Sequence, residues 1–204
     1  MEEKENIING HEYVDLGLSV LWATCNVGAE KPEDYGDYYA WGETETKYSY
    51  DEAVCETMGK DIDDISGTCL DVAHVKWGSP YLKWGGGWRM PTEEEFEELY
   101  NNCNRDWIFL RGVKVGKLTS NINRKSIFLP AGGYKDELSL ELEEEEIFYW
   151  SSTPGVYGDR YAYYFNNIPE VQTLDCIRYD GMLVRPVAEK ILVEQDMTCD
   201  QEEE

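Results

Sequence analysis

The segment WRMPTEEEFEELYNNC, residues 88–103, carries the clearest structural signal in the 204-residue chain. Thr92 is followed three residues later by Glu95, which is the pattern of a capping box, where each side chain binds a free backbone N–H at a helix start. Four residues then recur at helical spacing as an apolar stripe: Phe96, Leu99, Tyr100 and Cys103. The segment therefore predicts a helix that begins after Thr92 and buries this stripe.

A second helix is predicted near Cys69–Trp77, where apolar positions also recur with helical periodicity. The stripe consists of Leu70, Ala73, His74 and Trp77. His74 lies on this stripe, so it is better explained as a core or boundary residue than as a ligand.

The remaining ordered segments have the character of short strands bounded by Gly, Asn, Asp and Pro. They are Glu12–Leu16, Val20–Asn26, Trp107–Arg111, Val113–Thr119, Ser126–Pro130, Phe148–Ser151, Tyr161–Asn166, Val171–Cys176 and Leu183–Val187. Two helices packed on one side of such antiparallel strands, with long loops, make an α+β architecture. Five aromatic residues are assigned to the core: Trp22, Trp41, Trp88, Phe128 and Trp150.

The chain contains no linker rich in Pro or Ser and no fixed-period repeat, so a single domain is predicted over residues 11–189. Residues 1–10 form an acidic lead-in and residues 190–204 an acidic tail. Within the domain, the run Glu137–Glu146 is crowded with carboxylates, which repel one another unless they are solvated. We expect an exposed loop and strand entry there, with a cation site as the alternative.

The overall charge excludes several classes of function. With Lys+Arg 18 against Asp+Glu 42, the net charge is −24, so a nucleic-acid interface or an anionic membrane surface is not expected as a partner. Neither a signal peptide nor a transmembrane segment is recognised in the sequence. The six cysteines form no C-x-x-C pair and only two histidines are present, so no metal or other cofactor is predicted and the thiols are expected to be mostly free.

No catalytic motif is found, and the most informative functional signal is the tyrosine-rich stretch from Tyr149 to Tyr179. Tyrosine mixed with Ser, Gly and Asn is typical of binding surfaces, because the rigid ring supplies contact area at low entropic cost. The alternative is that these rings fill the core. The predicted contact surface comprises Tyr157, Asp159, Arg160, Tyr161, Tyr163, Asn166, Glu170, Gln172, Thr173, Asp175, Arg178 and Asp180.

Several blocks, in order along the chain, resemble one family. They are residues 13–20 (YVDLGLSV), 22–29 (WATCNVGA), 35–43 (YGDYYAWGE), 84–92 (WGGGWRMPT), 128–134 (FLPAGGY), 149–153 (YWSST) and 184–187 (VRPV). Together they resemble the Fibrobacter succinogenes major paralogous domain, which is common in Bacteroidetes. The resemblance implies a C-type lectin-like fold of the formylglycine-generating-enzyme and variable-protein type.

The same resemblance implies a non-enzymatic module that binds a protein or carbohydrate ligand at a cell surface or on a virion, as adhesins and phage receptor-binding proteins do. Formylglycine-generating activity is less expected, because the late cysteines Cys176 and Cys199 do not form the neighbouring pair that holds copper. The triplets of calcium-dependent sugar-binding lectins are also missing. A structural protein that uses the tyrosine-rich face for oligomerisation is the alternative, and the oligomeric state stays open.

Overall fold

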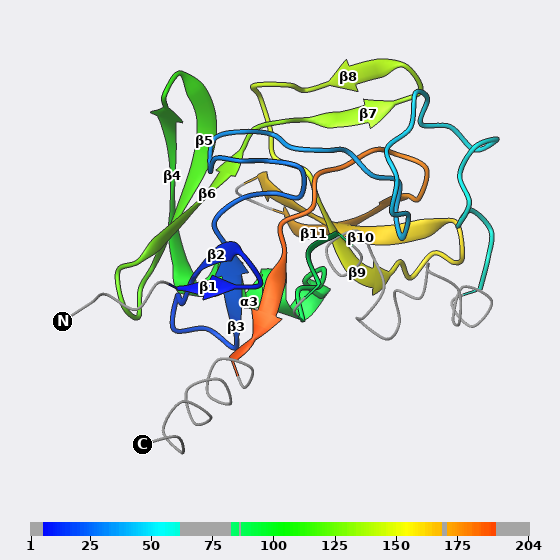
Figure 1. Ribbon diagram of the computed structural model, residues 1–204. Helices are drawn as coiled ribbons and strands as arrows, with labels where there is room; N and C mark the ends of the chain where they lie inside the picture. Colours follow the sequence, from blue (N-terminus) through cyan, green and yellow to red (C-terminus); the bar gives the residue numbers. More distant parts are fainter. Residues whose placement is uncertain (1–5, 62–82, 86, 169–170, 191–204) are drawn as a thin grey trace.

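The computed structural model describes residues 6–61, 83–85, 87–168 and 171–190 (Figure 1). These described residues are mostly β, with 40% in strands and 8% helical. The expected α+β, C-type lectin-like arrangement of two helices packed on strands is therefore wrong. The described strands divide into several small antiparallel sheets, and one helix is defined among the described residues. The other predicted helix, near Cys69–Trp77, lies outside them.

The first sheet joins segments from the two ends of the described chain. Its strands pair antiparallel, and Trp22 lies opposite Val14 on one side and Val187 on the other. All four residues of the central strand β3 are buried, because it is covered on both faces. The strand order is β1 (Ile7–Ile8), β2 (His11–Val14), β3 (Val20–Ala23) and β12 (Val187–Glu189).

The second sheet is a hairpin extended by one further strand. Its turn, Arg111 and Gly112, has φ of 50° and 93°, and two residues at positive φ match the twist of a tight hairpin. The first strand of the hairpin has no neighbour on its outer side among the described strands, so it is an edge. The order is β4 (Cys103–Leu110), β5 (Val113–Ser120) and β6 (Ser126–Pro130).

The third sheet carries the tyrosine-rich segment and contacts the helix α3 (Glu93–Asn102). The capping box is confirmed, with Thr92 Oγ1 accepting from the Glu95 backbone N–H and the Glu95 carboxylate accepting from that of Thr92. Phe96 of the helix stacks on Phe165 of β10 with ring centroids 4.7 Å apart. The order is β11 (Val171–Ile177), β10 (Tyr161–Ile168) and β9 (Tyr149–Pro154).

A small hairpin, β7 (Tyr134–Asp136) and β8 (Ser139–Glu141), carries the start of the acidic run Glu137–Glu146. Most of that run is exposed, and it includes strand β8, so the expectation of an exposed loop and strand entry is confirmed. Among the described residues, no group of acidic, His or Cys side chains is placed to hold a metal ion, and the run there shows no cation site.

Buried tryptophans tie the irregular loops to the sheets. Trp41 Nε1 donates to the carbonyl of Ser151 at 2.8 Å, and Trp150 Nε1 donates to that of Tyr39, also at 2.8 Å. Both bonds join the loop segment Tyr39–Trp41 to the strand that carries Trp150 and Ser151, so two buried indole donors hold these segments together. Of the predicted core aromatics, Trp22, Trp41, Trp88 and Trp150 are fully buried, as expected, whereas Phe128 is half-buried.

The guanidinium of Arg185 is fully buried and binds four protein oxygens. Nε donates to Asn26 Oδ1 at 2.8 Å, and the two terminal nitrogens donate to three carbonyls. Burial lowers the pKa of Arg185, because water no longer solvates the charge. The carbonyl acceptors are those of Ala23 (3.1 Å), Thr24 (3.0 Å) and Phe128 (2.8 Å).

We predict that Arg185→Met lowers the free energy of unfolding by at least about 3 kcal/mol, because several buried acceptors lose their donors. Urea unfolding followed by tryptophan fluorescence measures this loss. Arg160→Met is the matched control. Arg160 makes an exposed pair with Glu52, so its replacement should leave the free energy of unfolding nearly unchanged. Equal effects of the two changes would contradict a structural role specific to Arg185.

Candidate functional site

The structure divides the predicted contact residues by exposure. Tyr157, Asp159 and Arg160 are exposed on the loop between β9 and β10. Tyr161, Tyr163 and Asp175 are half-buried on the neighbouring strands, and Asn166, Arg178 and Asp180 are buried, so these last three do not lie on the surface. Glu170 is outside the described residues. Gln172 and Thr173 lie on β11, and their side chains are not among those described.

Side chains of strand β10 alternate between its two faces along part of its length. The face formed by Ala162, Tyr164 and Asn166 is buried. On the opposite face Tyr161 and Tyr163 are half-exposed, but Phe165 is buried under α3. Among the side chains described on this strand, the outward-facing ones are therefore confined to its first residues, next to the β9–β10 loop.

Arg178 was expected at the contact surface, but the structure places it inside. Its guanidinium lies over the Trp41 ring, 4.4 Å from the centroid. It donates to three backbone carbonyls, which belong to Thr57 (3.1 Å), Lys60 (2.8 Å) and Tyr161 (3.1 Å). A buried Arg that binds carbonyls leaves no sequence pattern, because its partners lie far away in the chain. This Arg fixes the loop before residue 61 against β10.

The loop between β9 and β10 is held at both of its ends. At its start, Asp175 Oδ2 accepts the backbone N–H of Val156 at 2.9 Å and that of Tyr157 at 3.3 Å. At its end, Arg160 makes a bidentate pair with Glu52, with both distances 2.8 Å. The Gly59 N–H also donates to the Asp159 carbonyl at 3.2 Å. These bonds fix the backbone of an otherwise irregular loop.

Two apolar side chains at the start of this loop face solvent, although its backbone is fixed. Val156 is 70% exposed and Tyr157 is 78% exposed. The ring of Tyr157 meets that of Tyr161 edge-on, with centroids 6.4 Å apart. Val156 was not among the predicted contact residues, and its position beside Tyr157 between Gly155 and Gly158 is the signal that could have found it.

A buried carboxyl lies behind the tyrosine-rich sheet. Cys176 Sγ donates to Asp180 Oδ2 at 2.9 Å. Burial raises the pKa of Asp180 to about 6, and the nearby charge of Asp136 acts in the same direction. Burial and the Asp180 carboxylate also raise the pKa of the Cys176 thiol, so this thiol stays protonated at neutral pH.

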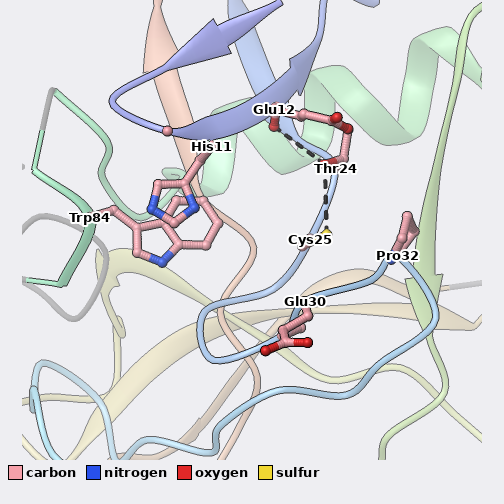
Figure 2. A pocket seen from close by; sticks show the side chains of 9 residues that line it. His11, Glu12, Thr24, Cys25, Glu30, Pro32 and Trp84 are labelled. Carbon is pink, nitrogen blue, oxygen red and sulfur yellow. Dashed lines mark hydrogen bonds between the residues drawn. The ribbon is translucent and has the colours of Figure 1, made fainter.

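A separate cavity of about 410 Å³ lies beside β2 and the segment that follows β3 (Figure 2). One wall is the imidazole of His11 stacked on the indole of Trp84, with centroids 3.7 Å apart and planes 4° from parallel. Sequence reasoning missed this site, because only the fold brings these two residues together. The lining residues are Gly10, His11, Glu12, Thr24, Cys25, Ala29, Glu30, Pro32 and Trp84.

The cavity offers hydrogen bonds and an aromatic wall, but no thiolate nucleophile. Burial raises the pKa of the Cys25 thiol, whose sulfur lies 3.7 Å from Thr24 Oγ1. Burial lowers the pKa of His11, so its imidazole is neutral at neutral pH. Since the reactive form of cysteine is the thiolate, Cys25 is not activated in this arrangement.

The described cysteines are free, as expected: Cys25, Cys55, Cys103 and Cys176. No helix in the described part of the chain is long and apolar enough to cross a membrane. Comparison with family models, with curated proteins and with solved structures finds no match.

We predict that Asp180→Asn removes a pH dependence of stability between about pH 4 and pH 7. The folded protein binds a proton on Asp180 more tightly than the unfolded chain, whose pKa is near 3.8. The free energy of unfolding of the wild type therefore falls by roughly 3 kcal/mol, through Asp180, as the pH rises through that range. Urea unfolding of the wild type and the variant at about pH 4 and about pH 7 measures how the free energy of unfolding of each depends on pH.

Asp159→Asn provides the matched control, because it removes the same charge from an exposed position. It should leave the pH dependence of the wild type in place. If the free energy of unfolding of Asp180→Asn changed with pH as steeply as that of the wild type, the raised pKa of Asp180 would be refuted.

Proposed function

We propose that this chain is a non-enzymatic binding module that recognises a protein or glycan ligand through the loop between β9 and β10. The observation that carries the proposal is the exposure of Val156 and Tyr157 on a loop whose backbone is already fixed. Val156 and Tyr157 are neighbouring apolar side chains that the fold leaves exposed, and exposed apolar side chains gathered in one patch are typical of a contact surface. A fixed loop also loses little entropy when it binds.

The chemistry of the loop suits such a ligand. Tyr157 offers a ring face for a sugar or an apolar side chain, and Tyr161 supports it edge-on. Arg160 and Asp159 add charged groups at the rim, which orient a polar partner. Tyr and Arg together are the residue types that most often dominate interface energies. The contact surface proposed here is thus Val156, Tyr157, Asp159, Arg160 and Tyr161.

Membership of the Fibrobacter succinogenes major paralogous domain family belongs to this proposal as well. It would be consistent with a role in display at a cell surface or on a virion. The proposal itself rests on the β9–β10 loop and stands without the family.

The experiment is a screen of the folded protein against arrays of glycans and surface proteins, in calcium and in chelator. We expect capture that is equal in both conditions, since no metal-holding cluster is found among the described residues. Tyr157→Ala should reduce capture at least about tenfold, a loss typical of an aromatic contact residue, while changing the unfolding free energy by less than about 0.5 kcal/mol.

Tyr48→Ala is the control, because Tyr48 is an exposed tyrosine outside the proposed contact surface. This variant should capture as well as the wild type. Loss of stability in Tyr157→Ala would instead assign the ring to the core. Unchanged capture by a stable Tyr157→Ala protein would exclude the loop as the contact surface.

A further inference from the structure

Charge is distributed very unevenly over this acidic chain. Residues 103–130, which form β4, β5 and β6, contain six Lys or Arg and one Asp, a net charge of +5. Residues 136–146, around β8, contain seven acidic and no basic residues, a net charge of −7. The molecule therefore carries a basic sheet and an acidic hairpin with opposite charges.

Strand β4 combines this basic charge with exposed aromatic side chains on an open sheet edge. Trp107 and Phe109 are 44% and 75% exposed, and their alternate positions place them on the same face. Arg105 is exposed on that face, and Lys114 Nζ lies 4.5 Å from the centroid of the Trp107 ring. In a hairpin, every second residue of an edge strand directs its backbone N–H and C=O away from its neighbour. This edge can therefore accept another strand.

Strand β8 presents the complementary chemistry. It pairs with β7 alone among the described strands, so its outer side is also an edge. Its residues are exposed, and three leucines on and beside it remain in contact with solvent. They are Leu138 at 68%, Leu140 at 37% and Leu142 at 37% exposure. Glu137, Glu141 and Glu143 alternate with these leucines along the chain.

We propose that the β4 edge of one copy of this chain pairs with the β8 edge of a second copy. The leucines would then cover Trp107 and Phe109, and the acidic hairpin as a whole would lie beside the basic sheet. A second copy is favoured over an unrelated acidic partner because the chain itself supplies both matching edges. The pairing extends a sheet across two molecules and buries apolar side chains that are exposed in the single chain.

This pairing is heterologous, because it joins two different surfaces. In Figure 1 the β4–β5 hairpin and the β7–β8 hairpin project from separate parts of the molecule. Each bound copy therefore keeps one free edge, and assembly continues beyond the dimer into a ring or an open chain. The β9–β10 loop is used by neither edge and stays available to a ligand.

The test is the mass of the full chain by light scattering over a range of concentrations. At about 0.15 M salt the Debye length is about 8 Å, so repulsion between distant acidic groups is screened. We expect the wild type to grow past the dimer as concentration rises. Phe109→Asp and Leu140→Lys should each be monomeric, since each destroys one edge. Tyr48→Asp, a change at another exposed ring, should assemble like the wild type.

Mixing the two edge variants gives the decisive result. Phe109→Asp keeps an intact β8 edge, and Leu140→Lys keeps an intact β4 edge, so an equimolar mixture should form a dimer that grows no further. Trp107→Asp and Leu138→Lys should repeat this pattern, which separates it from a folding defect in one variant. Circular dichroism checks that each variant is folded.

Three outcomes would overturn the proposal. The first is a wild type that stays monomeric up to about 1 mM. The second is a folded Leu140→Lys that assembles alone, which would mean that β4 pairs with itself or with another surface. The third is a mixture of the edge variants that stays monomeric. None of these outcomes bears on ligand capture by the β9–β10 loop, which the Tyr157 variant tests separately.

Discussion

The fully buried guanidinium of Arg185 holds three segments of the fold together. No carboxylate pairs with it among the described residues, so its charge is balanced only by protein oxygens from the end of β3, from Asn26 and from β6. A buried cation is tolerated only when its donors are satisfied, so these three segments must keep their positions together. Asn26 extends the network, because its amide donates to Tyr35 O and to Tyr149 Oη.

Arg178 repeats this arrangement beneath the proposed contact surface. Its bonds to the Thr57 and Lys60 carbonyls tie the preceding loop to β10, and Glu52 of the same region holds Arg160. Irregular segments therefore behave as parts of a fixed scaffold although they form few regular hydrogen bonds. The β9–β10 loop takes its rigidity from this scaffold, which leaves Val156 and Tyr157 free to serve as contact residues.

The features that could be predicted from the sequence are local ones. The capping box at Thr92 and the strand signals of β5, β6 and β10 depend on neighbouring residues, and they match the structure closely. The fold class was wrong because it depends on how strands group into sheets, as when β3 pairs with β12 from the far end of the chain. The burial of Arg178 and the stacking of His11 on Trp84 also depend on distant partners, so no local pattern could indicate them.

The β9–β10 loop is fixed before any ligand arrives, and amide hydrogen exchange of the free protein tests this rigidity most directly. The N–H of Val156 lies in an exposed loop but donates to Asp175 Oδ2 at 2.9 Å. We expect it to exchange at least about tenfold more slowly than in an unstructured peptide, which corresponds to an opening free energy of about 1.4 kcal/mol. Asp175→Ala should abolish this protection while the amide of Phe165 stays protected. Exchange of the Val156 amide at the peptide rate in the wild type would show that the loop is not fixed.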